Sequence, residues 1–132
     1  MSETYVKDFD GWNEKKKDLE RSSVKNVYFH EREIWWACLG VNIGFEQDGK
    51  HDDFERPVLI LKKFNRYVLL VVPLTSTVKD HKYYYQTKYE GKTYSVILSQ
   101  VRLISSKRLT RKVRRLPKDE FRGVVERIKG FI

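Results

Sequence analysis

Two apolar runs separated by two polar residues constrain the fold of this chain more than any other feature. Residues 57–64 (PVLILKKF) and 67–74 (YVLLVVPL) flank Asn65 and Arg66. Apolar runs of this length are typical of central strands, and so short a polar break between them predicts a tight hairpin. At 132 residues the chain has the length of one domain, and we expect that domain to be built around this hairpin.

Further strand signals lie on both sides of the hairpin. They comprise residues 34–39 (IWWACL), residues 83–89 and 93–98 around the turn sequence Glu90-Gly91-Lys92, and residues 100–104. Trp35 and Trp36 are adjacent, so in a strand they point to opposite faces and cannot both enter one core. We expect one of them to support a loop or an interface instead.

Both ends of the chain predict helices. Residues 9–21 carry apolar side chains near helical spacing, and we expect Trp12 to anchor this helix on the main body. A second helical face is formed by Phe121, Val124, Val125, Ile128, Phe131 and Ile132, and we expect it to pack through Phe121, Val125 and Ile128. The expected fold is mainly β, a small antiparallel barrel or curled sheet with a helix at each end and a long irregular loop over residues 40–55. A loop of that length is usually either functional or disordered.

The net charge of +9 is unevenly divided along the chain. Residues 56–132 hold 19 basic and 5 acidic side chains, whereas residues 34–55 hold 1 and 5. A cationic portion of this size suits a polyanion partner. Tyrosines and lysines interleaved over residues 79–94 suit single-stranded nucleic acid, although a half-buried hairpin has the same pattern. Charge therefore predicts a nucleic-acid binder and leaves the activity open.

Several common classes of site and location are disfavoured. The chain lacks the phosphate-binding, zinc-protease and nucleophile-elbow motifs. Its lone Cys38 excludes an internal disulfide and is expected to be a buried, inert thiol. The longest apolar run, residues 68–72, is too short to span a membrane, and the acidic N-terminus lacks the apolar region of a signal peptide. We expect a cytoplasmic protein with no membrane partner.

Clustered carboxylates in the loop offer one route to chemistry. These are Glu46, Asp48, Asp52, Asp53 and Glu55. They could bind Mg²⁺ in a metal-assisted nuclease. Because metal nucleases usually draw carboxylates from fixed elements across the fold, and these all lie on one segment, we favour a site that works without metal.

Arg56 and Thr75 are the residues that the predicted hairpin would bring together. Arg56 opens the first strand and Thr75 ends the second, so both would lie at one edge, facing the loop that carries Glu46. Cleavage of RNA by its own 2′-OH needs a proton acceptor, a proton donor and charge stabilisation on the phosphorane. An arginine and a hydroxyl can contact the phosphate oxygens. An ion pair between Arg56 and Glu55, with Thr75 closing a turn, explains the spacing equally well.

From Glu33 to the end, the sequence resembles the PemK/MazF toxins of type II toxin–antitoxin systems. The resemblance is carried in order by residues 33–36 (EIWW), 40–47 (GVNIGFEQ), 56–60 (RPVLI), 72–76 (VPLTS), 99–102 (SQVR) and 107–109 (KRL). It implies an SH3-like barrel and a metal-independent endoribonuclease that needs no cofactor. Such enzymes cut single-stranded RNA to 2′,3′-cyclic phosphate and 5′-OH ends. They act as homodimers in the cytoplasm. A cognate antitoxin silences them, and toxin and antitoxin together bind DNA.

The same resemblance implies roles for individual residues. Arg56 and Thr75 fall on the family's catalytic positions, and Glu46 is the third catalytic candidate. The candidates for RNA contact are Phe45, Gln47, Ser76 and Gln100. Residues 1–32 have no counterpart in compact members, so we divide the chain into a helical extension over 1–32 and an endoribonuclease-like domain over 33–132. Two other functions stay open: a non-catalytic toxin that binds a protein such as DNA gyrase, and a plain RNA-binding module.

Overall fold

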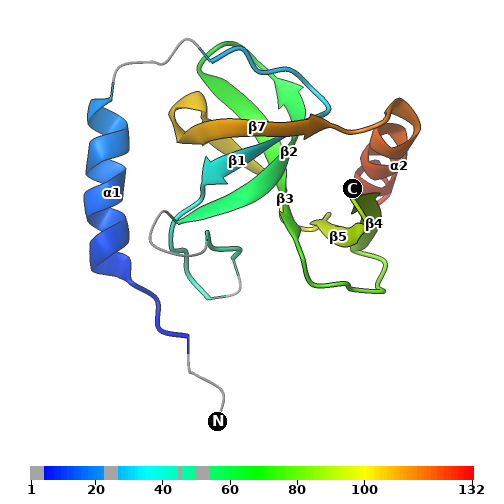
Figure 1. Ribbon diagram of the computed structural model, residues 1–132, viewed down its shortest axis with the longest axis horizontal. Coiled ribbons are helices and arrows are strands. Elements are labelled where there is room, and N and C mark those ends of the chain that lie inside the picture. The colour runs from blue at the N-terminus through cyan, green and yellow to red at the C-terminus, as the bar shows by residue number, and fades with distance from the viewer. Residues whose placement is uncertain (1–4, 23–26, 45, 50–53) are drawn as a thin grey trace.

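A curled antiparallel sheet with a helix on either side forms the body of the protein (Figure 1). The computed structural model describes residues 5–22, 27–44, 46–49 and 54–132. The elements in these residues are α1 (Phe9–Arg21), β1 (Glu33–Cys38), β2 (Glu55–Lys63), β3 (Val68–Thr75), β4 (Tyr84–Tyr89), β5 (Lys92–Ile97), β6 (Arg102–Ser105), the 3₁₀ helix η1 (Ser106–Arg108), β7 (Leu109–Arg115) and α2 (Lys118–Lys129). Their strands run in the order β4-β5-β3-β2-β1-β7, and β6 lies beside β3. The expected mainly-β architecture is confirmed.

The predicted central hairpin is formed by β2 and β3. Val58 pairs with Pro73, and the following residues continue an antiparallel register. The connection covers residues 64–67, four residues rather than the two polar ones. Asn65 shapes it, since its side-chain oxygen accepts hydrogen bonds from the backbone N–H groups of Tyr67 and Val68 at 2.8 and 3.0 Å. Such local bonds are a common way for asparagine to fix a turn.

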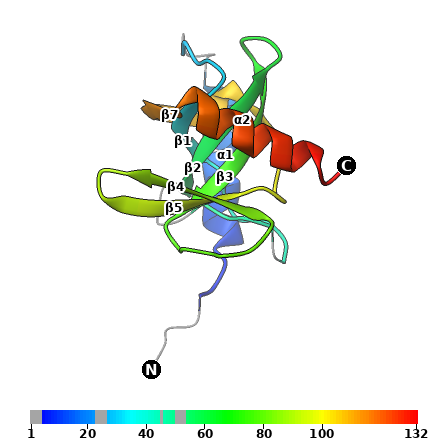
Figure 2. The same ribbon diagram turned by 90° about the vertical axis from the view of Figure 1, so that its right-hand side faces the viewer.

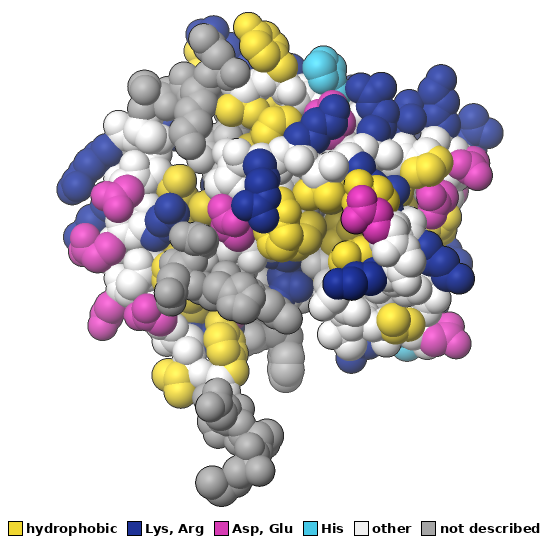
Figure 3. All heavy atoms as spheres, viewed as in Figure 1, with side chains coloured by type: hydrophobic (Ala, Val, Ile, Leu, Met, Phe, Trp, Pro, Cys, Tyr) yellow, Lys and Arg dark blue, Asp and Glu magenta, His cyan; other side chains and the backbone are white. Residues whose placement is uncertain are grey.

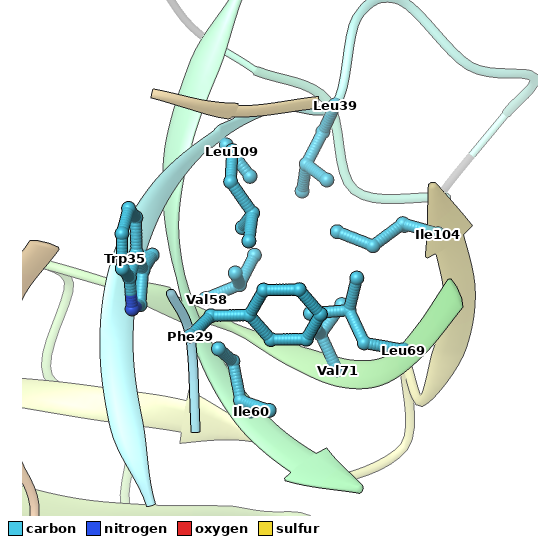
Figure 4. Packing of buried hydrophobic residues seen from close by; sticks show 10 residues of the cluster. Phe29, Trp35, Leu39, Val58, Ile60, Leu69, Val71, Ile104 and Leu109 are labelled. Atoms are coloured by element: carbon cyan, nitrogen blue, oxygen red, sulfur yellow. The ribbon is translucent and has the colours of Figure 1, made fainter. Parts of the chain in front are cut away.

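Apolar side chains pack on both faces of this hairpin. On one face the fully buried ring of Phe29 lies among Ile60, Leu69 and Val71 (Figure 4). Trp35 joins this core, whereas Trp36 is only half-buried on the opposite face. The expected division of the two tryptophans is therefore confirmed. Cys38 is buried, as predicted.

Helix α1 begins and ends at the predicted residues and lies on the side of the sheet opposite α2 (Figures 1 and 2). Its anchor is Trp12, which is 5% exposed and packs against Phe54 with ring centroids 5.6 Å apart. The indole covers Gly40, whose φ is +77° and whose added Cβ would lie 1.9 Å from the Trp12 ring. Only glycine fits both this conformation and this contact. No helix within the described residues is long and apolar enough to cross a membrane.

The structure corrects two details at the C-terminal end. In α2 the fully buried residue is Val124, not Val125, because the centre of the apolar stripe runs through Phe121, Val124 and Ile128. The helix ends at Lys129, so Phe131 and Ile132 leave the predicted face and are exposed. The basic stretch before α2 contains β7, a strand that its sequence LTRKVRR did not reveal.

Glu33 joins β1 to β7 through a buried carboxylate. Its Oε1 accepts hydrogen bonds from the His30 backbone N–H at 2.8 Å and from Trp35 Nε1 at 3.0 Å. Its Oε2 lies 3.0 Å from Lys112 Nζ and 3.6 Å from Arg115 Nη2. Burial alone would raise the pKa of Glu33, but the hydrogen bonds outweigh burial and lower that pKa to about 2.

We expect Glu33→Gln to be costly at neutral pH and nearly harmless in acid. The pKa of Glu33 in the fold, about 2, lies below the ordinary value of 4.5. The ionised carboxylate therefore stabilises the fold above pH ~4.5 and loses that effect as the pH falls toward 2. The shift corresponds to about 3 kcal/mol of unfolding free energy at pH 7. Urea unfolding at several pH values measures it.

The matched control is Glu31→Gln, which removes a carboxylate two residues earlier. Glu31 is 43% exposed and lies 3.7 Å from Lys62 Nζ, so its loss should cost less than 1 kcal/mol. A loss of stability for Glu33→Gln that is equal at pH 3 and pH 7 would contradict the assignment.

Candidate active site

Arg56 is held almost entirely inside the protein at the start of β2. It is 5% exposed. Its Nε donates to the backbone oxygen of Asp48 at 2.6 Å, and its Nη1 donates to that of Leu74 at 3.2 Å. With the Gln47 amide oriented so that its oxygen faces the guanidinium, this oxygen accepts from Nη2 at 2.7 Å. Arg56 and Glu55 form no ion pair, although the structure describes both residues.

The guanidinium of Arg56 is a cation that backbone and amide oxygens satisfy. Burial lowers the pKa of Arg56, and the nearby Asp48 carboxylate and Tyr5 phenol act in the opposite direction. Charge removed from water interacts more strongly with an approaching anion than the same charge in solvent. The environment of Arg56 therefore favours binding of an anionic group such as a phosphate.

Thr75 ends β3 beside this arginine. The register that pairs Val58 with Pro73 places Thr75 opposite Arg56 when it is continued by two residues. The bond from Arg56 to the oxygen of Leu74 agrees with this placement. The Thr75 hydroxyl oxygen accepts from the Thr77 N–H at 3.2 Å, which leaves its proton to be donated elsewhere. The structure thus brings together the two residues that the hairpin was expected to join.

A pocket of about 370 Å³ opens beside Arg56, between the central strands and the β4–β5 hairpin. Its lining includes Arg56 and Ser76, together with the aromatic side chains of Trp36, Tyr89 and Tyr94. In Figure 3 apolar side chains are exposed in the middle of the face, with both basic and acidic side chains around them. The pocket therefore combines aromatic surfaces with charges of both signs, since Arg56 and Arg114 share its lining with Glu55 and Glu90.

A second hollow of about 540 Å³ carries the remaining polar candidates. Gln100 Oε1 accepts from the Gln47 N–H at 2.7 Å, and both residues line it. Gln47 connects this hollow with Arg56, because its backbone N–H bonds to Gln100 and its amide faces the guanidinium.

Glu46 lies in this second hollow and not beside Arg56. It is exposed, and the cation that its charge affects is Arg102. Burial lowers the pKa of Arg102, and Glu46 acts against that shift. Among the described residues Glu46 forms no hydrogen bond or ion pair with Arg56 or Thr75. Sequence spacing could not reveal this separation, because it depends on the path of the loop.

The acidic cluster of the loop does not gather in the part of the chain that the structure describes. No group of three or more His, Cys, Asp or Glu side chains close enough to hold a metal ion is found there. Asp48 is buried and accepts hydrogen bonds from the Asn42 N–H at 2.6 Å and the Tyr5 hydroxyl at 3.0 Å. In the sequence, Asp48 is one of several loop carboxylates with nothing to set it apart, and no pattern connects it with Tyr5. Phe45, Asp52 and Asp53 lie outside the described residues.

Solved structures share this fold at low sequence identity. The chain is similar to MazF from Deinococcus radiodurans (18% identity, TM-score 0.67, covering 80% of this chain and 97% of that one). It is also similar to the toxin MazF-mt6 of Mycobacterium tuberculosis (22% identity, TM-score 0.58, covering 75% of this chain and 94% of that one). A third similar structure is an endoribonuclease in complex with its cognate antitoxin from a mycobacterial species (11% identity, TM-score 0.56, covering 80% of this chain and 98% of that one). At such identities the likeness shows the fold alone.

The sequence itself identifies the family. No protein with a curated description matches the chain. A family profile, described as PemK-like, MazF-like toxin of type II toxin-antitoxin system, matches residues 30–132. This match covers most of the sequence and agrees with the mainly-β half-barrel and its terminal helices. The chain belongs to the PemK/MazF-like toxins of type II toxin–antitoxin systems.

Proposed function

We propose that this toxin is an endoribonuclease that cleaves single-stranded RNA without a metal ion, leaving 2′,3′-cyclic phosphate and 5′-OH ends. The observation that carries the proposal is Arg56, a buried guanidinium fixed by three acceptors at the edge of a pocket, with the Thr75 hydroxyl at the neighbouring strand end. A similar structure is described as an endoribonuclease, which supports the same class of activity here.

In the proposed reaction the 2′-OH of the RNA attacks the adjacent phosphate and gives up its proton to solvent, while the 5′ oxygen of the next nucleotide leaves and takes up a proton from solvent. Negative charge accumulates on the pentavalent phosphorus as the new bond forms. Three of the five N–H donors of Arg56 bond to described residues, and the other two have no acceptor among those residues. These donors would stabilise the phosphorane without reorganising, and Thr75 would donate one more hydrogen bond.

We assign an electrostatic role to Arg56 rather than a role as general base, because of the ordinary pKa of the guanidinium. Burial lowers the pKa of Arg56, which is the direction that proton transfer requires. The ordinary pKa of an arginine lies above 12, so most guanidinium groups stay protonated during catalysis. Glu46 lies beside Arg102, and we assign it to the orientation of RNA.

The surroundings of Arg56 suit an unpaired RNA strand. Trp36, Tyr89 and Tyr94 offer rings on which bases can stack, and such stacking is available only to unpaired bases. Ser76 and Gln100 would contact RNA from the two hollows. Gln47 would act chiefly through Arg56, whose guanidinium its amide faces. From the resemblance, Phe45 is proposed as a further RNA contact.

Two partners belong to the proposal. The toxin would act as a homodimer in the cytoplasm, with residues 33–132 as the nuclease domain and residues 1–32 as an extension. An acidic antitoxin would occupy the cationic RNA groove, because both ligands are polyanions attracted by the same charge. Together with the antitoxin the toxin would bind DNA.

Arg56→Ala is expected to lower the cleavage rate at least a hundredfold, which is the usual loss when an oxyanion-stabilising donor is removed. Thr75→Val keeps the shape of the side chain and should lower the cleavage rate about tenfold to a hundredfold. Incubation with a mixed RNA pool, followed by sequencing of the ends, measures rate, site and end chemistry together. Arg122→Ala, on the exposed face of α2, is the matched control.

The same assay separates the alternatives. Full activity in Arg56→Ala would remove Arg56 from the reaction. A wild-type protein that binds the pool without cutting it would be an RNA-binding module, and one that neither binds nor cuts would point to a protein target.

Cleavage is expected to continue in EDTA, at a rate within twofold of the untreated enzyme, since the proposed charge stabilisation comes from side chains. Addition of Mg²⁺ after EDTA should also change nothing. Loss of activity in EDTA that Mg²⁺ restores would return the acidic loop to consideration as a metal site.

The protein is expected to be a dimer by light scattering at micromolar concentration, and the antitoxin is expected to weaken RNA binding in proportion to its occupancy. Fluorescence anisotropy with a labelled RNA measures the competition, and Arg56→Ala protein avoids cleavage during the titration. A monomer would contradict the first expectation. Inhibition of cleavage at unchanged RNA affinity would contradict the second.

A further inference from the structure

Residues 5–21 form a segment that we name the N-terminal strap, which lies against the loop beside Arg56. The profile match begins at residue 30, so the strap lies outside it. Near its start, Tyr5 Oη donates to Asp48 Oδ2 at 3.0 Å. Lys7 Nζ lies 3.4 Å from the same oxygen and also donates to the backbone oxygens of Asn42 and Gly44. Two strap side chains therefore converge on one buried carboxylate.

A second anchor holds the strap a turn further along. Trp12 packs on Phe54, just before β2, and covers Gly40, just after β1. The Arg108 guanidinium lies 5.5 Å from the Trp12 ring and donates to the Cys38 oxygen at 3.0 Å. The strap thus contacts both ends of the loop at Trp12 and its interior at Asp48.

Asp48 connects these contacts with Arg56. Its carboxylate accepts from Tyr5 and from the Asn42 N–H, and its own backbone oxygen accepts from Arg56 Nε at 2.6 Å. A carboxylate fixed by several donors fixes the peptide to which it is attached. Side chains of the strap therefore contact, through the Asp48 carboxylate, the residue whose backbone oxygen binds the guanidinium.

We propose that Tyr5 and Lys7 are positioning residues for Arg56, acting through Asp48. The effect on cleavage rests on the proposed function, whereas the effect on Arg56 itself does not. A chain with the half-barrel alone would lack these contacts, so the strap is an addition that orients the site of this particular toxin. Pre-organised donors are effective because they need no reordering in the transition state.

The direct test compares Tyr5→Phe with Tyr28→Phe. Each variant removes one hydroxyl, but Tyr28 is 79% exposed, and its hydroxyl bonds to no site residue that the structure describes. Solvent exchange of the Arg56 Nε–H, followed by ¹⁵N NMR on the full chain, reports on its bond to Asp48. Exchange should be at least fivefold faster in Tyr5→Phe and unchanged in Tyr28→Phe. In the double variant Tyr5→Phe, Lys7→Met the Arg56 Nε–H should exchange faster than in Tyr5→Phe alone, because both side chains contact Asp48.

Coupling distinguishes positioning from a general loss of stability. In an Asp48→Ala background the acceptor for Tyr5 is gone, so adding Tyr5→Phe should leave the Arg56 exchange rate unchanged. In the otherwise native protein Tyr5→Phe should lower kcat three- to tenfold and leave KM within twofold. A merely structural strap would lower Tm without this coupling or this division between kcat and KM.

Two results would overturn the inference: unchanged Arg56 exchange in the double variant, or an equal effect of Tyr5→Phe with and without the Asp48 carboxylate. Failure of the proposed function is a separate outcome. A wild-type protein that cuts no RNA would refute the nuclease assignment, while the exchange measurements would still decide whether the strap orients Arg56.

Discussion

Strand β3 changes its pairing partner along its length, and the shape of the sheet depends on that change. On one edge it pairs with β2, while its other edge pairs first with β6 at residues 68–71 and then with β5 at Leu74 and Thr75. One strand thereby belongs to both halves of a curled sheet. The second partner begins where β3 ends, so Thr75 pairs with β5 on one edge and lies opposite Arg56 of β2 on the other when the β2–β3 register is continued.

The Arg56 guanidinium can be buried only because oxygen atoms accept its hydrogen bonds. An unpaired charge removed from water is very unfavourable, yet no carboxylate forms an ion pair with Arg56 among the described residues. Two backbone oxygens and an amide oxygen accept from it instead. Such acceptors satisfy the N–H donors without cancelling the positive charge. A bidentate carboxylate partner would have occupied the face that the proposed phosphate uses.

The sequence predicted what local pattern determines and missed what depends on the path of the loop. The β2–β3 hairpin, the bounds of α1 and the opposite orientations of Trp35 and Trp36 follow from apolar spacing, which local geometry dictates. The adjacency of Arg56 and Thr75 follows from the hairpin. Glu46 and Asp48 lie in a stretch without periodic pattern, and their positions are set by contacts distant in sequence. Asp48 contacts Tyr5, 43 residues away, and no property of either residue announces the pair.

The basic side chains of β7 make two kinds of contact: some approach a buried carboxylate and others lie over aromatic rings. In β7, Lys112 and Arg115 approach Glu33 of β1, whereas Arg111 lies over the Trp36 ring at 5.0 Å and Arg114 over the Tyr89 ring at 4.5 Å. The β1–β7 pairing shifts register twice, between Ile34 and Trp35 and between Trp36 and Ala37. The side chains of β7 therefore do not simply alternate between the two faces. Charged side chains on an edge strand also oppose pairing with another chain. The stretch therefore neutralises a buried carboxylate on one side and contributes Arg114 to the lining of the aromatic pocket beside Arg56 on the other.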